Sequence, residues 1–343
     1  MAIKIGINGF GQIGKQVYKA IRQRYAEEIE VVAVNDAGRV NVMKQLVKFN
    51  SNNGSNNGRF SDAVTTLENR FITGGGEIRI LSERNASKLP WGKLGVDIVI
   101  ESTGLFGRRE KAQLHLDAGA QKVIITAPCI EEDLTIVLGV NETMYEPERH
   151  HILSIASCVT NGLAPVAKVL FDKFGIEQGV LFSYMNSQRL LELEADEPCD
   201  SGSPTQKTVP SKTGAAKAVG VVIPQLKGKF TGMAFRVPAP PFSVIDFTAL
   251  LSRKTPVEEI NAAMKEYAEG TMKGILNYSE VTFAKSDSKG DAHSSIFSAP
   301  DTLVVGGNLA KVVVWYDNES GYSMRVADLI HYLAAKKTKA AVV

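Results

Sequence analysis

The feature that most restricts how this chain can fold is the hexapeptide GFGQIG at residues 9–14. Residues 3–7 before it form a short apolar run typical of a buried strand, and residues 12–25 carry apolar side chains at helical spacing. A second apolar, β-branched run follows at residues 30–35. Strand, helix and strand in this order predict a βαβ unit with parallel strands and a right-handed crossover.

The same hexapeptide predicts a dinucleotide site. Glycine-rich turns are common, and the alternative is a turn that merely connects strand and helix. Between a strand and a helix, however, these glycines let a pyrophosphate approach the helix N-terminus. Asp36 closes the second strand, where its carboxylate would accept hydrogen bonds from the adenosine ribose and repel a 2′-phosphate. We therefore expect NAD, with NADP as an alternative because Arg39 follows closely.

The rest of the chain predicts two domains. Short apolar runs at residues 78–81, 96–101, 122–127 and 136–140 are typical of parallel strands buried on both faces. Beyond residue 157, strand-like runs follow one another with few helices between them; they lie at residues 230–237, 243–251 and 311–316. This change favours a second, mainly antiparallel α+β domain after an α/β Rossmann domain.

The expected boundaries follow from this change of pattern. We assign residues 1–157 to the NAD-binding domain and residues 158–317 to the catalytic domain, with a C-terminal helix at 318–343 packing back on the first domain. The asparagine-rich tract at residues 50–58 has no apolar side chain, so we expect an exposed loop there.

Composition excludes several classes of partner. With 39 basic and 37 acidic residues, the net charge of +2 gives no reason to expect nucleic acid. No apolar run approaches the ~18 residues of a membrane helix, so we expect a soluble, cytoplasmic protein without a membrane partner. The three cysteines have no metal-ligand spacing and an odd count, so we expect neither a disulfide framework nor a metal site.

Six short segments, in order along the chain, carry a resemblance to a known family. They are INGFG at 7–11, ESTG at 101–104, ASC at 156–158, TGAAK at 213–217, FRVP at 235–238 and WYDNE at 315–319. With them the chain resembles the glyceraldehyde-3-phosphate dehydrogenases over nearly its whole length. The resemblance implies a homotetramer with one NAD per subunit, which oxidises a phosphorylated aldehyde and transfers the acyl group to inorganic phosphate.

The resemblance also assigns site residues, position by position. Cys158 matches the family's nucleophile. The positions that match the dinucleotide site are Asn8, Gly9, Phe10, Gly11, Gln12, Ile13, Asp36, Arg84, Ser102, Thr126 and Asn318. The positions that match the two anion sites for substrate and phosphate are Ser157, Ser187, Thr213, Gly214 and Arg236.

Cys158 has the sequence setting of a reactive thiol. It precedes a helical pattern that runs through Phe171, and a helix N-terminus lowers the pKa of a thiol. A thiolate that adds to an aldehyde makes a tetrahedral carbon able to release hydride, and a thioester remains. The alternative for Cys158 is an inert thiol in the core.

Several positions depart from the family pattern. The family's histidine, which acts as base toward the cysteine, has Phe182 in its place, in a segment about three residues short. Val159, Met185 and the stretch CDSGSP at 199–204 replace groups that support the anion sites or the interface, and Gln12 replaces an arginine. We therefore expect reduced activity. The alternatives are an NAD-binding paralogue with a structural or regulatory role, or another reaction, such as that of a semialdehyde dehydrogenase, on this scaffold.

Overall fold

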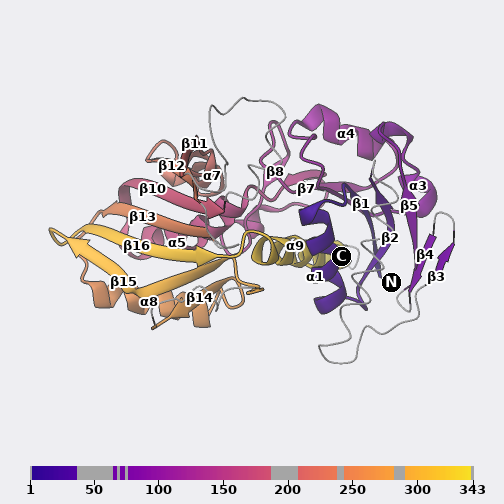
Figure 1. The fold of residues 1–343 in the computed structure, drawn as a ribbon. Coiled ribbons are helices and arrows are strands. Elements are labelled where there is room, and N and C mark those ends of the chain that lie inside the picture. The colour runs from indigo at the N-terminus through magenta and orange to yellow at the C-terminus, as the bar shows by residue number, and fades with distance from the viewer. Residues whose placement is uncertain are drawn as a thin grey trace. The chain divides into compact units, whose positions relative to one another are not determined.

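The chain folds into two compact units in a computed structural model (Figure 1). The structure describes residues 2–36, 65–67, 70–73, 76–186, 208–237, 243–281 and 290–340. The first unit comprises residues 1–135, 145–155 and 326–343, and the second comprises residues 136–144 and 156–325. None of the helices in these described ranges has the length and hydropathy that a membrane span requires.

The first unit is built on a nine-stranded sheet with the order β3-β4-β5-β2-β1-β6-β7-β9-β8. Its strands are β1 (Ile3–Asn8), β2 (Ile29–Asn35), β3 (Thr65–Leu67), β4 (Arg70–Thr73), β5 (Gly76–Leu81), β6 (Ile98–Glu101), β7 (Lys122–Ile125), β8 (Leu134–Thr135) and β9 (Ile152–Ser154). β1 pairs in parallel with both β2 and β6, and antiparallel pairing is confined to the β3-β4-β5 end. The parallel Rossmann sheet expected from the sequence is confirmed.

Helices of the first unit lie between these strands in the chain, except for the last helix, which ends the chain. They are α1 (Gln12–Arg24), α3 (Trp91–Leu94), α4 (Arg109–Asp117) and, from Val326 onward, the C-terminal helix α9 (Ser320–Ala340); a short 3₁₀ turn lies at Ala86–Lys88. Asp328 of α9 accepts a hydrogen bond from the Tyr25 hydroxyl at 2.6 Å and one from Arg24 Nη1 at 3.2 Å. These contacts tie the middle of α9 to the C-terminal end of α1.

One expected strand is wrong. Residues 136–140 form a turn rather than a strand, and regular pairing ends with β8 at Thr135. Gly139 has φ +80°, and the Val137 amide donates to the Asn141 side chain at 2.8 Å instead of to a neighbouring strand. The apolar run is buried by packing, since a Cβ at Gly139 would lie 3.1 Å from the Ile275 side chain. An apolar run predicts burial, and here the burial comes from a packed turn and not from pairing with a strand.

The second unit contains a seven-stranded, mainly antiparallel sheet with the order β11-β12-β10-β13-β16-β15-β14. Its strands are β10 (Ile176–Asn186), β11 (Val209–Lys212), β12 (Phe230–Val237), β13 (Ser243–Leu251), β14 (Leu276–Ser279), β15 (Ser295–Val305) and β16 (Leu309–Tyr316). Only the β10–β12 and β14–β15 pairs among these strands are parallel. The mainly antiparallel α+β domain expected from the sequence is therefore present.

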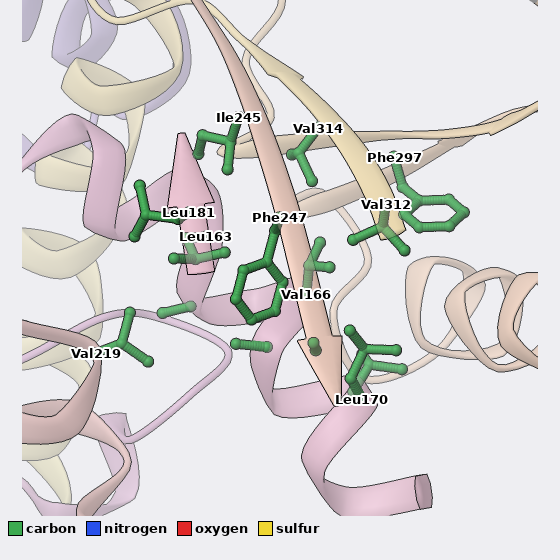
Figure 2. Packing of buried hydrophobic residues seen from close by; sticks show 14 of the residues in the cluster. Leu163, Val166, Leu170, Leu181, Val219, Ile245, Phe247, Phe297, Val312 and Val314 are labelled. Atoms are coloured by element: carbon green, nitrogen blue, oxygen red, sulfur yellow. The ribbon is translucent and has the colours of Figure 1, made fainter. Parts of the chain in front are cut away.

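The helices of the second unit pack on one face of this sheet. They are α5 (Cys158–Phe174), α7 (Ala215–Val222) and α8 (Val257–Glu269), with 3₁₀ turns at Glu142–Met144 and Pro224–Leu226. Figure 2 shows Leu163, Val166 and Leu170 of α5 packed among side chains of the sheet. Burial along β13 alternates strictly, so every second side chain points to α5. We call this side of the sheet the core face and the opposite side the outer face.

Candidate active site

The turn after β1 is built for close approach of a ligand. Gly9 has φ +91°, and a Cβ there would lie 2.7 Å from the Thr103 amide nitrogen. At Gly14 a Cβ would lie 2.1 Å from the Gly9 carbonyl oxygen, so both positions require glycine. At Gly11 a Cβ would meet nothing within 4 Å, which leaves open space beside the turn.

The N-terminus of α1 follows this turn without a side-chain cap. Gly11 is the N-cap residue, and the first turn of α1 contains no acidic residue. The amide groups at the start of a helix have no partners within the helix and favour an anion. The open space at Gly11 and the uncapped amides fit the pyrophosphate of a dinucleotide.

Asp36 faces the same turn from the end of β2. Its Oδ2 accepts a hydrogen bond from the Phe10 amide at 2.7 Å. Ser102, just after β6, donates from its hydroxyl to the Gly9 carbonyl at 2.7 Å. Because β1 lies between β2 and β6, the carboxyl ends of these strands mark the switch point where such sheets bind ligands.

The other positions assigned to the dinucleotide are distributed differently. Thr126 follows β7, and its hydroxyl donates to the Glu101 carbonyl at 3.1 Å. Arg84 is exposed after β5. The structure thus brings residues 8–13, Asp36 and Ser102 together, whereas Asn318 belongs to the second unit.

A buried polar network that sequence reasoning missed lies under the turn. Glu101 Oε2 accepts from Asn8 Nδ2 at 2.6 Å and lies 3.0 Å from His115 Nε2. The Trp91 indole donates to His115 Nδ1 at 3.0 Å, so His115 Nε2 carries its proton and donates to Glu101. Asn35 Nδ2 donates to Asn8 Oδ1 at 2.7 Å, which joins β2 to the network. The sequence could have indicated this network, because Asn8, Asn35 and Glu101 each stand at the end of an apolar strand.

Cys158 is the first residue of α5, in the second unit. Ser157 caps the helix by accepting from the Thr160 amide at 3.2 Å. Ala156 before it has φ +57°, a strained conformation for a non-glycine residue, and its carbonyl accepts from the Tyr322 hydroxyl at 2.8 Å. The helix dipole at this position favours a thiolate over a thiol.

A row of polar and sulfur-containing side chains lies on the core face where the sheet ends. Arg236 pairs with Met185 across β12 and β10, and Arg236 Nη1 lies 4.0 Å from Met185 Sδ. Ser243 pairs with Tyr316 across β13 and β16. Ser183, one step back along β10, is fully buried, and its Oγ lies 3.5 Å from the Tyr316 hydroxyl oxygen.

Phe182 points away from this row. Leu181, Ser183 and Met185 are buried, whereas Phe182 and Tyr184 between them are more exposed and lie on the outer face. The Phe182 and Phe235 rings are 6.2 Å apart, and Tyr184 stacks on Phe235 at 5.4 Å. Phe182, which we expected in the place of the family's histidine, is thus on the face opposite α5.

The anion-site positions are only partly described. Thr213 accepts from the Ala215 amide at 3.2 Å, immediately before α7, and Gly214 is the N-cap residue of that helix. The Asn318 side-chain oxygen accepts from the Ser243 hydroxyl at 2.9 Å. Ser187 lies outside the described residues, as do Arg39 and the stretch at 199–204.

All five histidines lie in the described part of the chain, and four of them belong to the first unit: His115, His150, His151 and His331. Burial lowers the pKa of His150, whose Nδ1 accepts from the Glu146 amide at 3.0 Å. In the second unit, His293 Nδ1 lies 2.7 Å from Asp291 Oδ1. Among the described residues, no cluster of three or more histidine, cysteine or acidic side chains could hold a metal ion.

Comparisons with known proteins decide the family. Residues 3–109 match the family described as glyceraldehyde 3-phosphate dehydrogenase, NAD binding domain, and residues 157–318 match its C-terminal domain. The chain belongs to the glyceraldehyde-3-phosphate dehydrogenase family. It is 49% identical to the glyceraldehyde-3-phosphate dehydrogenase of Geobacillus stearothermophilus and 48% identical to glyceraldehyde-3-phosphate dehydrogenase 1 of Bacillus subtilis strain 168. Each match covers 98% of this chain and 99% of the relative.

Family membership gives the two units their general roles. The first unit contains the NAD-binding domain of a glyceraldehyde-3-phosphate dehydrogenase, so the cofactor is NAD. The second unit contains all the residues that match the C-terminal family domain, with Cys158 at its start. The protein is therefore an oxidoreductase of this family.

Proposed function

We propose that this protein oxidises glyceraldehyde 3-phosphate with NAD and transfers the acyl group to inorganic phosphate, with Cys158 as the nucleophile. The observation that carries the proposal is the position of Cys158 at the N-terminus of α5, in a chain of this family. The helix N-terminus supplies the electrostatic bias that a thiolate needs at neutral pH.

The chemistry starts at the sulfur of Cys158. The thiolate attacks the aldehyde carbon, and the carbonyl electron pair moves onto oxygen to give a thiohemiacetal anion. NAD would supply the hydride acceptor when bound, and loss of hydride from this carbon leaves a thioester to Cys158. Attack of phosphate on the thioester carbon releases the acyl phosphate and returns the thiolate.

Two groups of residues in the second unit would hold the anions. The guanidinium of Arg236, at the sheet end beside Met185, would bind the substrate phosphate. Ser157, Thr213 and Gly214 would hold inorganic phosphate, and Ser187 would contribute to one of the two anion sites, as the family resemblance implies. Thr213 and Gly214 support this role because they precede the N-terminus of α7.

We propose that the protein turns over more slowly than relatives that keep a histidine at the reacting centre. Phe182 supports this view, because its ring is an apolar side chain on the outer face. A missing general base or oxyanion donor typically lowers a rate by ~10²–10⁴-fold. The alternative is a paralogue that binds NAD without turning over.

We further propose a homotetramer. In support, the outer face of the second sheet exposes a set of apolar side chains that a partner subunit would cover. They include Val180, Tyr184 and Met233, with exposed fractions of 39%, 37% and 44%. Light scattering after size exclusion measures the subunit count, and a monomer would contradict this assembly.

Stopped-flow measurement of NADH formation tests the activity, with saturating glyceraldehyde 3-phosphate, with and without phosphate. We expect phosphate-dependent turnover that Cys158→Ala abolishes, whereas Cys129→Ala, at the other described free cysteine, leaves it unchanged. Tight NAD binding with neither burst nor turnover would favour the non-catalytic paralogue. A burst with a different aldehyde alone would favour another reaction on this scaffold.

A further inference from the structure

A histidine and a glutamate are buried side by side beneath the dinucleotide turn. They belong to a hydrogen-bonded set of side chains in the first unit, which we call the buried network: Trp91, His115, Glu101, Asn8 and Asn35. None of the five is more than 4% exposed. Burial of polar groups costs free energy that apolar side chains of similar size would not, so the network indicates a role beyond packing.

Glu101 is the centre of the buried network, because each of its two oxygens binds two donors. Oε2 accepts from Asn8 and from His115, as described above. Oε1 accepts from the Thr103 amide at 2.8 Å and from the Thr103 hydroxyl at 2.5 Å. Four donors match the four lone-pair sites of a carboxylate. A fully bonded group of this kind is held rigidly in one orientation.

The buried network also joins segments that the sequence assigns to the dinucleotide. Asn8 opens the glycine turn directly. Asn35 binds the backbone of Glu83 twice, because its side chain donates to the Glu83 carbonyl at 2.9 Å and accepts from the Glu83 amide at 2.9 Å. Glu83 immediately precedes Arg84. The distance between the glycine turn and the backbone at Arg84 therefore depends on two asparagine side chains.

The segment after β6 is held against the glycine turn by the same network. A Cβ at Gly9 would lie 2.7 Å from the Thr103 amide nitrogen, so the two backbones are in contact. Glu101 fixes that amide, and the ring of Phe106 lies 5.1 Å from the ring of His115. A displacement of His115 or Glu101 would therefore move residues 103–106 relative to the turn.

Trp91 determines which nitrogen of His115 faces Glu101 as a donor. The indole donates to Nδ1, so the proton of the neutral ring lies on Nε2. With the proton on Nδ1 instead, Nε2 would present a lone pair to the carboxylate oxygen 3.0 Å away. The bond between His115 and Glu101 thus requires the indole as well as the imidazole.

We propose that His115 and Trp91 are positioning residues for NAD. Both side chains are fully buried, so they act through Glu101, which sets the spacing of the glycine turn and the segment beside it. A turn whose amides are already ordered binds more tightly, because ordering them on binding costs free energy. The proposal concerns cofactor affinity alone, so it does not depend on the role proposed for Cys158.

Calorimetric titration of the full-length protein with NAD tests this role, with thermal unfolding of the same samples. We expect His115→Leu, which removes the donor to Glu101, to lower NAD affinity by about tenfold. His115→Gln should restore most of that affinity, because its amide can accept from Trp91 and donate to Glu101. Trp91→Phe leaves the His115 proton without a fixed position and should lower NAD affinity by a smaller factor.

Ile29→Ala is the matched control for stability. Ile29 is buried at the start of β2, at the opposite end of the strand from Asn35. This variant should lower the unfolding temperature and keep the wild-type NAD affinity. If Ile29→Ala loses as much affinity as His115→Leu, any loss of stability suffices and the positioning role is wrong.

Three other results would overturn the proposal. If His115→Leu unfolds at a lower temperature but keeps NAD affinity within about threefold of wild type, the network only stabilises the fold. Equal affinities for His115→Gln and His115→Leu would show that hydrogen bonding at this position does not matter. If His115→Leu does not fold, Trp91→Phe decides, and wild-type NAD affinity in that variant would refute the role.

Discussion

Replacing Phe182 with histidine, the residue that the family resemblance leads us to expect there, should not give fast catalysis. Side chains along β10 alternate between the two faces of the sheet, and Phe182 lies on the outer face while Ser183 lies on the core face. An odd change in strand length exchanges the faces of all following residues. A histidine at 182 would therefore point to Phe235 rather than to the side of Cys158.

The structure sets the expected size of the effects. Phe182→His keeps a half-buried ring beside Phe235, so its loss of stability should stay near the 0.5–1.5 kcal/mol typical of an aromatic pair. A newly placed general base would raise the rate by ~10²–10⁴-fold, whereas a histidine on the wrong face should change kcat/KM by less than about threefold. Ser183→His is the matched variant on the core face. Overpacking a fully buried position typically costs about 1–3 kcal/mol.

Steady-state NADH formation across pH measures the outcome. We expect Phe182→His to keep both the wild-type kcat/KM and the wild-type pH profile. A Ser183→His protein that still binds NAD should instead gain an ionisation near ~6.5 in its pH profile. A hundredfold or larger rise in kcat/KM for Phe182→His would refute the assignment of faces and the reasoning about register.

Three further predictions concern the first unit. Gly14→Ala should lower NAD affinity by about tenfold or more and also lower stability, because its Cβ would lie 2.1 Å from the Gly9 carbonyl oxygen. Gly11→Ala should lower only NAD affinity, because its Cβ would meet nothing within 4 Å. Calorimetry measures the affinity, and thermal unfolding measures the stability. Glu101→Gln should lower the free energy of unfolding by about 1–3 kcal/mol in urea titration, because both partners of Glu101 Oε2 donate and an amide NH₂ cannot accept from them. Although burial raises the pKa of Asp133, hydrogen bonds from two backbone amides and an arginine more than offset this and hold it below its ordinary value. The resulting stability is present above pH ~4 and is lost as pH falls through the native pKa, so Asp133→Asn should destabilise at pH 7 and differ less from wild type at pH 3. An equal difference at both values would contradict this assignment.

Much of the fold could be predicted because local pattern and tertiary structure agree. The run at residues 3–7, the glycine turn and α1 follow from periodicity and from the positive φ of Gly9. The strand expected at residues 136–140 failed because an apolar run reports burial and not hydrogen-bond partners. Those residues are buried in a turn. A run of five apolar residues is too short for its periodicity to distinguish a buried turn from a strand or a helix.

The sites were predictable to different degrees. Cys158 and the glycine turn could be found from short motifs, because each motif specifies its own local backbone. The contacts among Trp91, His115 and Glu101 join residues far apart in sequence, so only the folded sheet brings them together. The face on which Phe182 lies depends on the register of β10, and a comparison of residue types alone does not give that register.

This difference means that the two sites would respond differently to a change in sequence. The dinucleotide turn would bind through its backbone amides and the space beside its glycines, so the identity of an exposed side chain such as Gln12 at the start of α1 does not set its geometry. The core face of the second sheet is instead formed by side chains, including those of β10, and successive side chains of a strand lie on opposite faces of the sheet. An odd change in the length of β10 would move every following side chain to the opposite face of the sheet. Activity at Cys158 therefore depends on the register of β10 as well as on the residue types that this strand carries.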